Sequence, residues 1–270
     1  MHFINFTAMK TMNPSIRALV CGSTQGIGLA IAQQLAQDGF SVTLTARNEN
    51  KLVAAIATLD VSKGQNHQFM VADFSQPQVL KEAIHKELQK NGNIHVLVNN
   101  TGGPKSGPIV DAEPEEFLAA FNQHLICNHV LMQAVVGGMK DAGFGRIVNI
   151  ISTSVKQPLP NLGVSNTIRG AVANWSKTLA NELGAFGITV NNVLPGATNT
   201  QRLTEIASVK ANKTGEAVAA ILTEMGQESP MKRIAEPQEV AAAVAFLASP
   251  AASYINGINL PVDGGRTKSL

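Results

Sequence analysis

Residues 17–28 read RALVCGSTQGIG. The short run 17–21 is apolar after its first residue, and glycines follow it at positions 22, 26 and 28. A short apolar run that ends at glycine is typical of a buried parallel strand, and Ile27, Ile31 and Leu35 then recur at the four-residue spacing of a helix. The stretch therefore predicts a strand, a glycine-rich turn and a helix.

The glycine turn has two interpretations. It is either an ordinary strand-to-helix turn or the place where backbone N–H groups at a helix N-terminus meet the phosphates of a dinucleotide. Its position after the first strand of an alternating chain favours the dinucleotide, because a Cβ there would hold a diphosphate off the backbone. The expected cofactor contacts in this turn are Gly22, Ser23, Gln25, Gly26, Ile27 and Gly28.

Apolar runs alternate with helical patterns along the rest of the chain, which is typical of βαβ units and a parallel sheet. We therefore expect an α/β fold, a Rossmann-type doubly wound sheet of seven mainly parallel strands with helices on both faces. The expected strands are 17–21, 41–46, 67–71, 95–99, 146–151, 188–194 and 258–262.

A chain of 270 residues has room for one large α/β domain. We expect a single dinucleotide-binding domain over 1–270, in which 1–13 is an N-terminal extension and 201–230 a substrate lid. Only 15% of residues are charged, and the segment 117–139 carries no charge, so we expect it to form a long helix buried on several sides. These features favour a homotetramer or homodimer, built partly on that helix and on the C-terminal segment with Phe246 and Tyr254.

Composition also excludes several classes of function. The net charge of +2 without a basic run disfavours binding to nucleic acid or to an anionic membrane, and the polar residues in 117–139 exclude a spanning helix. Two cysteines, Cys21 and Cys127, and no secretory signal favour the cytoplasm without a disulfide. His124 and His129 are five residues apart without an accompanying cysteine or carboxylate cluster, so no metal site is expected.

The spacing Gly-x-x-x-Gly-x-Gly resembles the short-chain dehydrogenase/reductase family. The resemblance continues along nearly the whole chain, in the segments 99–102 (NNTG), 145–152 (GRIVNIIS), 195–200 (PGATNT), 230–233 (PMKR), 246–249 (FLAS) and 262–265 (VDGG). It implies hydride transfer between a nicotinamide cofactor and a carbonyl or alcohol. It further implies cofactor contacts at Asn99, Thr101, Gly102, Pro195, Gly196 and Thr200.

The end of the second strand indicates which nicotinamide cofactor is bound. A carboxylate there binds the ribose hydroxyls of NAD, whereas this chain has no acid and one arginine, Arg47. Because a guanidinium pairs well with phosphate, we predict NADP(H) in preference to NAD(H). Arg47 in a solvated loop is the alternative. Asp73 resembles the family aspartate near the adenine ring, and its alternative is a helix N-cap.

The resemblance places the catalytic positions at Ser152, Ser165, Arg169 and His124. Ser152 matches the substrate-orienting serine, while Ser165 and Arg169 stand where the family has its tyrosine and lysine. His124 stands at the position of the family asparagine. The only tyrosine of the chain is Tyr254, so a mechanism with a mid-chain tyrosine acid is excluded.

Two hypotheses from different classes follow. In the first, an oxidoreductase with an altered site reduces a 3-oxoacyl thioester, a sugar or another small ketone. Ser152 polarises the carbonyl, Arg169 stabilises charge and also contacts the cofactor ribose, and His124, with an ordinary pKa of about 6.5, or a water that it orders supplies the proton. In the second, the protein binds NADP(H) without turnover, as a sensor or an inactive partner subunit. A measurement of hydride transfer separates them.

Overall fold

The computed structural model describes residues 16–269, so the expected extension 1–13 lies outside the described residues. Seven parallel strands form one sheet in the order β3-β2-β1-β4-β5-β6-β7. The predicted strands are confirmed, and no end is displaced by more than one residue. Their bounds are β1 (Arg17–Cys21), β2 (Ser41–Ala46), β3 (Gln68–Val71), β4 (Val96–Asn99), β5 (Gly145–Ile150), β6 (Ile188–Pro195) and β7 (Asn259–Val262).

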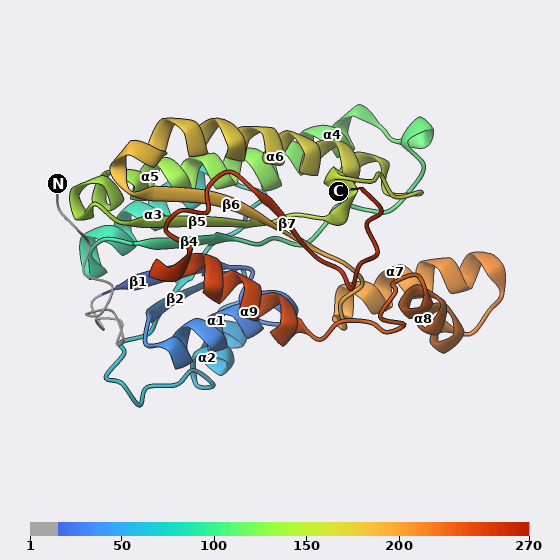
Figure 1. Cartoon of the computed structure of the whole chain (residues 1–270), viewed down its shortest axis with the longest axis horizontal. Coiled ribbons are helices and arrows are strands. Elements are labelled where there is room, and N and C mark those ends of the chain that lie inside the picture. The colour runs from blue at the N-terminus through green and yellow to red at the C-terminus, as the bar shows by residue number, and fades with distance from the viewer. Residues whose placement is uncertain (1–15, 270) are drawn as a thin grey trace.

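Helices cover both faces of the sheet, as predicted (Figure 1). One face carries α1 (Gly26–Asp38), α2 (Glu49–Ile56) and α9 (Pro237–Ala248), and the other carries α3 (Pro77–Asn91), α5 (Cys127–Ala142) and α6 (Gly163–Leu183). The remaining helical segments are α4 (Pro114–Phe121), α7 (Gln201–Thr214), α8 (Val218–Gln227), the π-helical η3 (Asn122–Ile126) and the 3-10 turns η2 (Ile109–Asp111), η4 (Thr153–Val155), η5 (Gly184–Phe186) and η6 (Pro250–Ala252).

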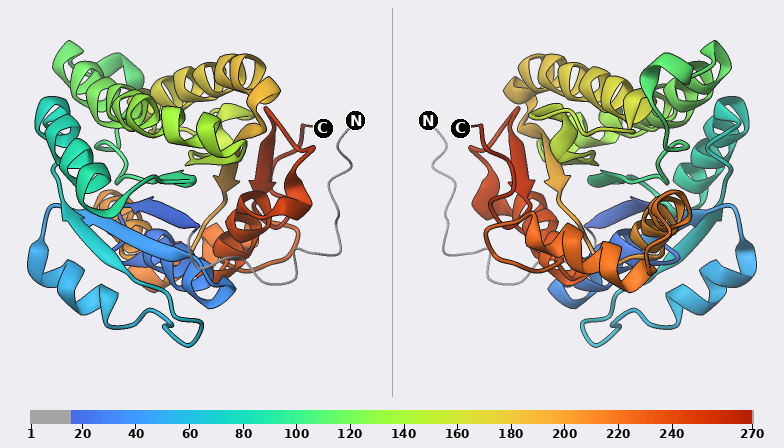
Figure 2. Two further views of the ribbon diagram at one scale, coloured as in Figure 1. Left: turned by 90° about the vertical axis from the view of Figure 1, so that its left-hand side faces the viewer. Right: turned by 90° about the vertical axis from the view of Figure 1, so that its right-hand side faces the viewer.

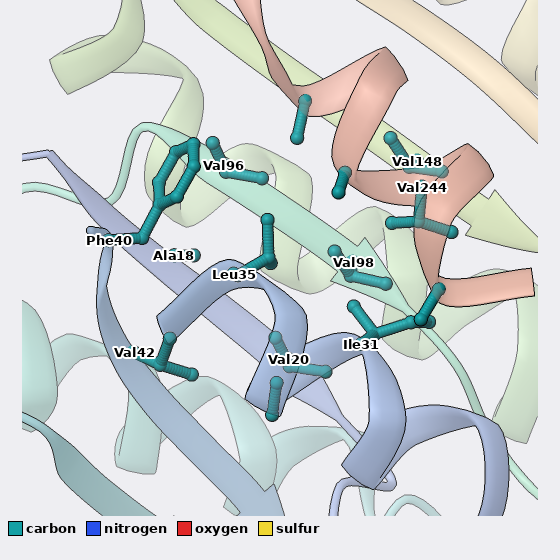
Figure 3. Packing of buried hydrophobic residues seen from close by; sticks show 14 of the residues in the cluster. Ala18, Val20, Ile31, Leu35, Phe40, Val42, Val96, Val98, Val148 and Val244 are labelled. Carbon is teal, nitrogen blue, oxygen red and sulfur yellow. The ribbon is translucent and has the colours of Figure 1, made fainter. Parts of the chain in front are cut away.

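The core beneath α1 follows directly from the sequence pattern (Figure 3). Ile31 and Leu35, four residues apart on α1, are fully buried against Val20 and Val98 of the two central strands. Val244 of α9 closes the same cluster. A fully buried aliphatic side chain contributes about 1.5–3 kcal/mol to folding. This core therefore fixes α1 against β1, which sets the position of the glycine turn between them.

The strand order reverses at β1, which lies between β2 and β4. Segments that leave the carboxyl ends of neighbouring strands on either side of such a reversal diverge, and ligands of open α/β sheets bind in the crevice between them. The turns after β1, β4, β5 and β6 therefore meet at one end of the sheet. The helices α7 and α8 stand beyond the end of the sheet where β6 leads into α7, as Figures 1 and 2 show.

The uncharged segment 117–139 is helical, as predicted. The prediction that a single chain buries it on several sides is wrong. It runs through α4, the π-helical η3 and α5. One side is buried, whereas Leu118 and Phe121 are 63% and 38% exposed. A helix above a sheet has only one face that the sheet covers, so the apolar residues on the other side stay accessible. In the described residues no helix combines the length and apolar character needed to cross a bilayer.

Candidate active site

The glycine turn after β1 is tightly built. Gly22 and Gly26 have φ values of 58° and 54°, in the left-handed region that favours glycine. A Cβ on Gly28 would lie 2.2 Å from the carbonyl oxygen of Gly22, and one on Gly22 would lie 2.6 Å from that of Asn100. No side chain caps the first turn of α1, and Gln25 is its N-cap. The free N–H groups of this turn are therefore available to an anion, which fits the diphosphate of a dinucleotide.

One cavity of about 570 Å³ lies on the β2 side of the turn. Arg47 and Asp73 both line it, at the ends of β2 and β3. A hydrogen bond from the backbone N–H of Ser75, 2.9 Å from Oδ1, lowers the pKa of Asp73, and the charge of Arg47 acts in the same direction. The N-cap of α3 is Gln76, so Asp73 does not fill that alternative role. Lys51 adds a cation that sequence reasoning missed, although it follows Arg47 by four residues.

A second cavity, of about 320 Å³, lies on the other side of the turn. It brings together Ser152, Ser165 and Arg169, which come from the end of β5 and from α6. The predicted residues Gly22, Gln25, Gly26, Ile27, Gly28, Thr101, Gly102, Pro195, Gly196 and Thr200 line it as well. The structure therefore places most of the predicted cofactor and catalytic residues around one connected cleft.

A third cavity, of about 470 Å³, continues from the second towards the lid segment. The two share Ser152, whose side chain also accepts a hydrogen bond from the backbone N–H of Ser154 at 3.1 Å. The apolar residues that line the third cavity are Leu159, Leu162, Leu203, Ile206, Val209 and Met225. Four charged residues, Lys210, Lys213, Glu228 and Arg266, line it as well. Ser152 therefore stands where the cofactor cleft joins a space that α7 and α8 line with both apolar and charged side chains.

Arg169 is a buried fixed charge at this junction. The residue is 8% exposed, and Nη1 donates a hydrogen bond to the carbonyl oxygen of Ile150 at 2.9 Å. Burial lowers the pKa of Arg169 to about 10, and the charge of Arg202 acts in the same direction. The guanidinium therefore stays protonated at neutral pH and can stabilise negative charge, but it does not release a proton there.

The structure buries His124 at the edge of the cleft. This residue lies in the π-helical η3, is 1% exposed, and its Nδ1 is 2.6 Å from Oγ1 of Thr101. Its Nε2 is buried without a hydrogen-bond partner. Burial, with a smaller effect from Arg169, lowers the pKa of His124 to about 2. The imidazole is therefore neutral near pH 7, which disfavours direct proton donation from an imidazolium.

Two predicted cofactor residues turn their side chains away from the cleft. Oγ of Ser23 accepts a hydrogen bond from the backbone N–H of Thr45 at 3.0 Å, and Nδ2 of Asn99 donates to Oδ1 of Asn149 at 2.8 Å. The neighbouring Asn100 lines the cleft instead, and its Nδ2 donates to the carbonyl oxygen of Cys21 at 3.1 Å. Alternation of side chains along β4 decides this, because adjacent residues of a strand face opposite sides.

The structure also reveals a residue that sequence reasoning missed. Arg202 of α7 lines the cavity of Arg169, and its Nη2 donates to the carbonyl oxygen of Pro104 at 2.7 Å. Arg202 also forms an ion pair with Glu205, with Nη1 and Oε2 3.6 Å apart. Nothing in the local sequence marks Arg202, because it meets Pro104 only across 98 positions of chain.

Other reactive groups do not form a second centre. Over 16–269, no group of three or more His, Cys, Asp or Glu residues is placed to hold a metal ion. Cys21 and Cys127 are free and buried. Burial raises the pKa of Cys127 to about 12 and that of Cys21 further, so both thiols are protonated at neutral pH.

Comparison with known proteins agrees with this geometry. Residues 22–267 match the model of a family described as Enoyl-(Acyl carrier protein) reductase. The 3-oxoacyl-(acyl-carrier-protein) reductase FabG of Haemophilus influenzae is 38% identical over 250 residues, covering 92% of this chain and 96% of that protein.

Two solved structures share the fold at 30% identity. YwfH, an NADPH-dependent reductase involved in bacilysin biosynthesis, superimposes with a TM-score of 0.89 over 94% of this chain and 99% of that chain. L-sorbose reductase from Gluconobacter frateurii, complexed with NADPH and L-sorbose, superimposes with a TM-score of 0.88 over 96% of this chain and 100% of that chain. With the glycine turn, the strand order and the cleft, these matches show that the chain belongs to the short-chain dehydrogenase/reductase family.

Proposed function

We propose that this protein is an NADP(H)-dependent oxidoreductase that moves a hydride between the nicotinamide and a small carbonyl or alcohol substrate through an altered catalytic site. The observation that carries the proposal is the shared cavity of the glycine turn, Ser152 and Arg169. The turn would hold the diphosphate of the cofactor in the same cavity that contains this serine and this charge. The named activities of the similar reductases support the same reaction class.

The preference for NADP(H) over NAD(H) rests on the β2 end of the cleft. Arg47 and Lys51 line the cavity there, and the segment 43–48 contains no carboxylate. Two cations favour a 2′-phosphate, whereas a carboxylate at this place would repel it. Asp73, on the neighbouring strand end, remains free to contact the adenosine half.

When bound, NADP(H) supplies or accepts the hydride. The hydroxyl of Ser152 donates a hydrogen bond to the carbonyl oxygen and so fixes its orientation. Arg169 stabilises the negative charge that develops on this oxygen, and it acts strongly because it is buried. Ser165, one helical turn before Arg169, adds a hydroxyl to the same cavity but is too weak an acid to replace a phenol.

The proton then comes from water in the cleft. Arg169 keeps its protons, and His124 is neutral and closed off by burial. His124 acts as a positioning residue instead, because its Nδ1 holds the hydroxyl of Thr101 at the edge of the cavity. Water reaches Ser152 through the third cavity beneath α7 and α8.

A non-catalytic NADP(H)-binding protein is the alternative function. The observation that favours it is the lack of a side chain with a pKa near 7 among Ser152, Ser165, Arg169 and His124. Oxidation of NADPH with a broad panel of carbonyl compounds separates the two functions. We expect turnover in the wild type and a loss of about 100-fold or more in S152A, with NADPH affinity within about twofold. No turnover in the wild type, but turnover in the double variant S165Y/R169K, would establish the alternative.

Three properties of the whole molecule complete the proposal. We place the active protein in the cytoplasm, where Cys21 and Cys127 stay reduced. We expect a homotetramer or homodimer, because Leu118, Phe121, Phe246 and Tyr254 are 63%, 38%, 46% and 102% exposed. The segment 201–230 serves as a substrate lid. It is supported by a small core of its own, Ala207, Ala211 and Ile221, separate from the core of the sheet.

A further inference from the structure

Arg169 is a buried charge without a matching carboxylate. The described residues that line its cavity include no aspartate and no glutamate. Among the described residues, its guanidinium donates one hydrogen bond, to the neutral carbonyl of Ile150. Burying a charge is costly unless an opposite charge or a set of hydrogen bonds compensates it. The positive charge of Arg169 is therefore not compensated within the cavity, which suits the binding of an anion.

A second guanidinium, that of Arg202, lines the same cavity from a different helix. It belongs to α7 in the lid segment, whereas Arg169 belongs to α6. The hydrogen bond to the carbonyl oxygen of Pro104 holds the Arg202 side chain at the wall of this cavity. Its ion pair with Glu205 is weak, because the two side chains are 39% and 53% exposed and the charged atoms are 3.6 Å apart.

The two arginines lie close enough to repel each other. Both guanidinium groups line the same cavity, and the charge of Arg202 lowers the pKa of Arg169. An anion bound between or beside them would replace this repulsion with two attractions. A carboxylate is the natural partner, since a guanidinium binds it through two parallel hydrogen bonds.

The cofactor has other places for its own phosphates. The uncapped first turn of α1 fits the diphosphate, and Arg47 with Lys51 fits a 2′-phosphate. Arg202 does not line the cavity of Arg47, but it does line that of Ser152. The pair Arg169 and Arg202 therefore lines the cavity that contains Ser152, and not the cavity at the β2 end.

We propose that the substrate is an oxo acid, with its carboxylate on Arg202 and its carbonyl oxygen on Ser152 and Arg169. This inference rests on the proposed oxidoreductase function and names its substrate class. In the reduction, the hydride of NADPH adds to the carbonyl carbon and the C=O π electrons move to oxygen, which takes a proton from water and leaves a hydroxide that the solvent neutralises. The products are a hydroxy acid and NADP⁺, and the carboxylate is unchanged. The apolar part of the third cavity, lined by Leu203, Ile206 and Val209, accommodates the remaining side chain of the acid.

Binding of oxamate, an unreactive 2-oxo acid mimic, tests the carboxylate site without turnover. Calorimetry is performed on wild type, R202Q, R202K and R47Q, each saturated with NADP⁺. We expect R202Q to weaken oxamate binding by about tenfold or more, because a charge-assisted bidentate contact is lost. The oxamate affinity of R202K should lie between those of wild type and R202Q, since lysine keeps the positive charge but lacks the two parallel donors of a guanidinium.

The control variant R47Q removes the same charge from the other end of the cleft. In a separate titration with NADP⁺ it should weaken NADP⁺ binding, whereas its oxamate affinity should stay within about twofold of wild type. R202Q should show the opposite pattern. The proposal is overturned if oxamate fails to bind the wild type, if R202Q binds it equally well, or if R202Q weakens NADP⁺ instead of oxamate.

Turnover separates this inference from the function on which it rests. Oxo acids and their methyl esters are compared as oxidants of NADPH. Preference for the acid in wild type, lost in R202Q, supports the substrate class. Equal reduction of acid and ester contradicts the substrate class but leaves the oxidoreductase function standing. Oxamate binding that depends on Arg202, without reduction of any carbonyl, contradicts the oxidoreductase function alone.

Discussion

The buried imidazole of His124 should make folding stability depend on pH in a way that one substitution removes. An imidazole in the unfolded chain gains a proton as the pH falls below about 6.5. In the folded protein the pKa is about 2, so the imidazole stays neutral. The unfolded state therefore binds more protons below pH 6.5, and stability is lost as the pH falls through that value. Above it the contribution of His124 no longer changes.

The magnitude follows from the distance between the pH and the unfolded pKa. At pH 5.0 the unfolded imidazole is about 1.5 units below its pKa, and each unit is worth about 1.36 kcal/mol. Wild type should therefore lose about 2 kcal/mol between pH 7.5 and 5.0 through this one residue. For a chain of this size that corresponds to a decrease in Tm of about 4–8 °C.

The assay compares urea unfolding of wild type and H124N at several pH values and one protein concentration. Asparagine does not titrate, so the difference between the two free energies of unfolding isolates the imidazole from His95 and the carboxylates. This difference should change by about 2 kcal/mol over the range. H85N is the matched control, because His85 is exposed, and it should run parallel to wild type. Parallel curves for H124N as well would refute the burial argument.

Two further predictions concern the cofactor and the assembly. R47A should lose about 1–3 kcal/mol of affinity for NADPH and little for NADH, because Arg47 meets only the 2′-phosphate. Fluorescence titration measures this, and equal affinities for the two cofactors that are unchanged in R47A would contradict it. Sedimentation equilibrium at micromolar concentration should show a dimer or tetramer, and F121E should shift it towards monomer because a charge replaces an apolar contact. A monomeric wild type would disprove the expected assembly.

The sequence alone determined the strands and their layers. The run 17–21 and the spacing of Ile31 and Leu35 predict β1 and the buried face of α1, because both patterns depend only on local backbone periodicity. The glycine turn follows the same logic, since a positive φ at Gly22 and Gly26 favours glycine at those positions. The resemblance to the family likewise predicted Ser152, Ser165 and Arg169 as one catalytic site, and all three line one cavity.

Only the tertiary structure decided which of these side chains face the cleft and how they are charged. Asn99 and Asn100 are adjacent and chemically alike, yet one bonds to Asn149 across the sheet and the other lines the cleft. His124 has an ordinary pKa in the sequence, and its burial beside Arg169 changes that pKa to about 2. Arg202 reaches the cleft from a distant helix. Desolvation and charge interactions depend on atoms that are far apart in the chain and meet only in the folded protein.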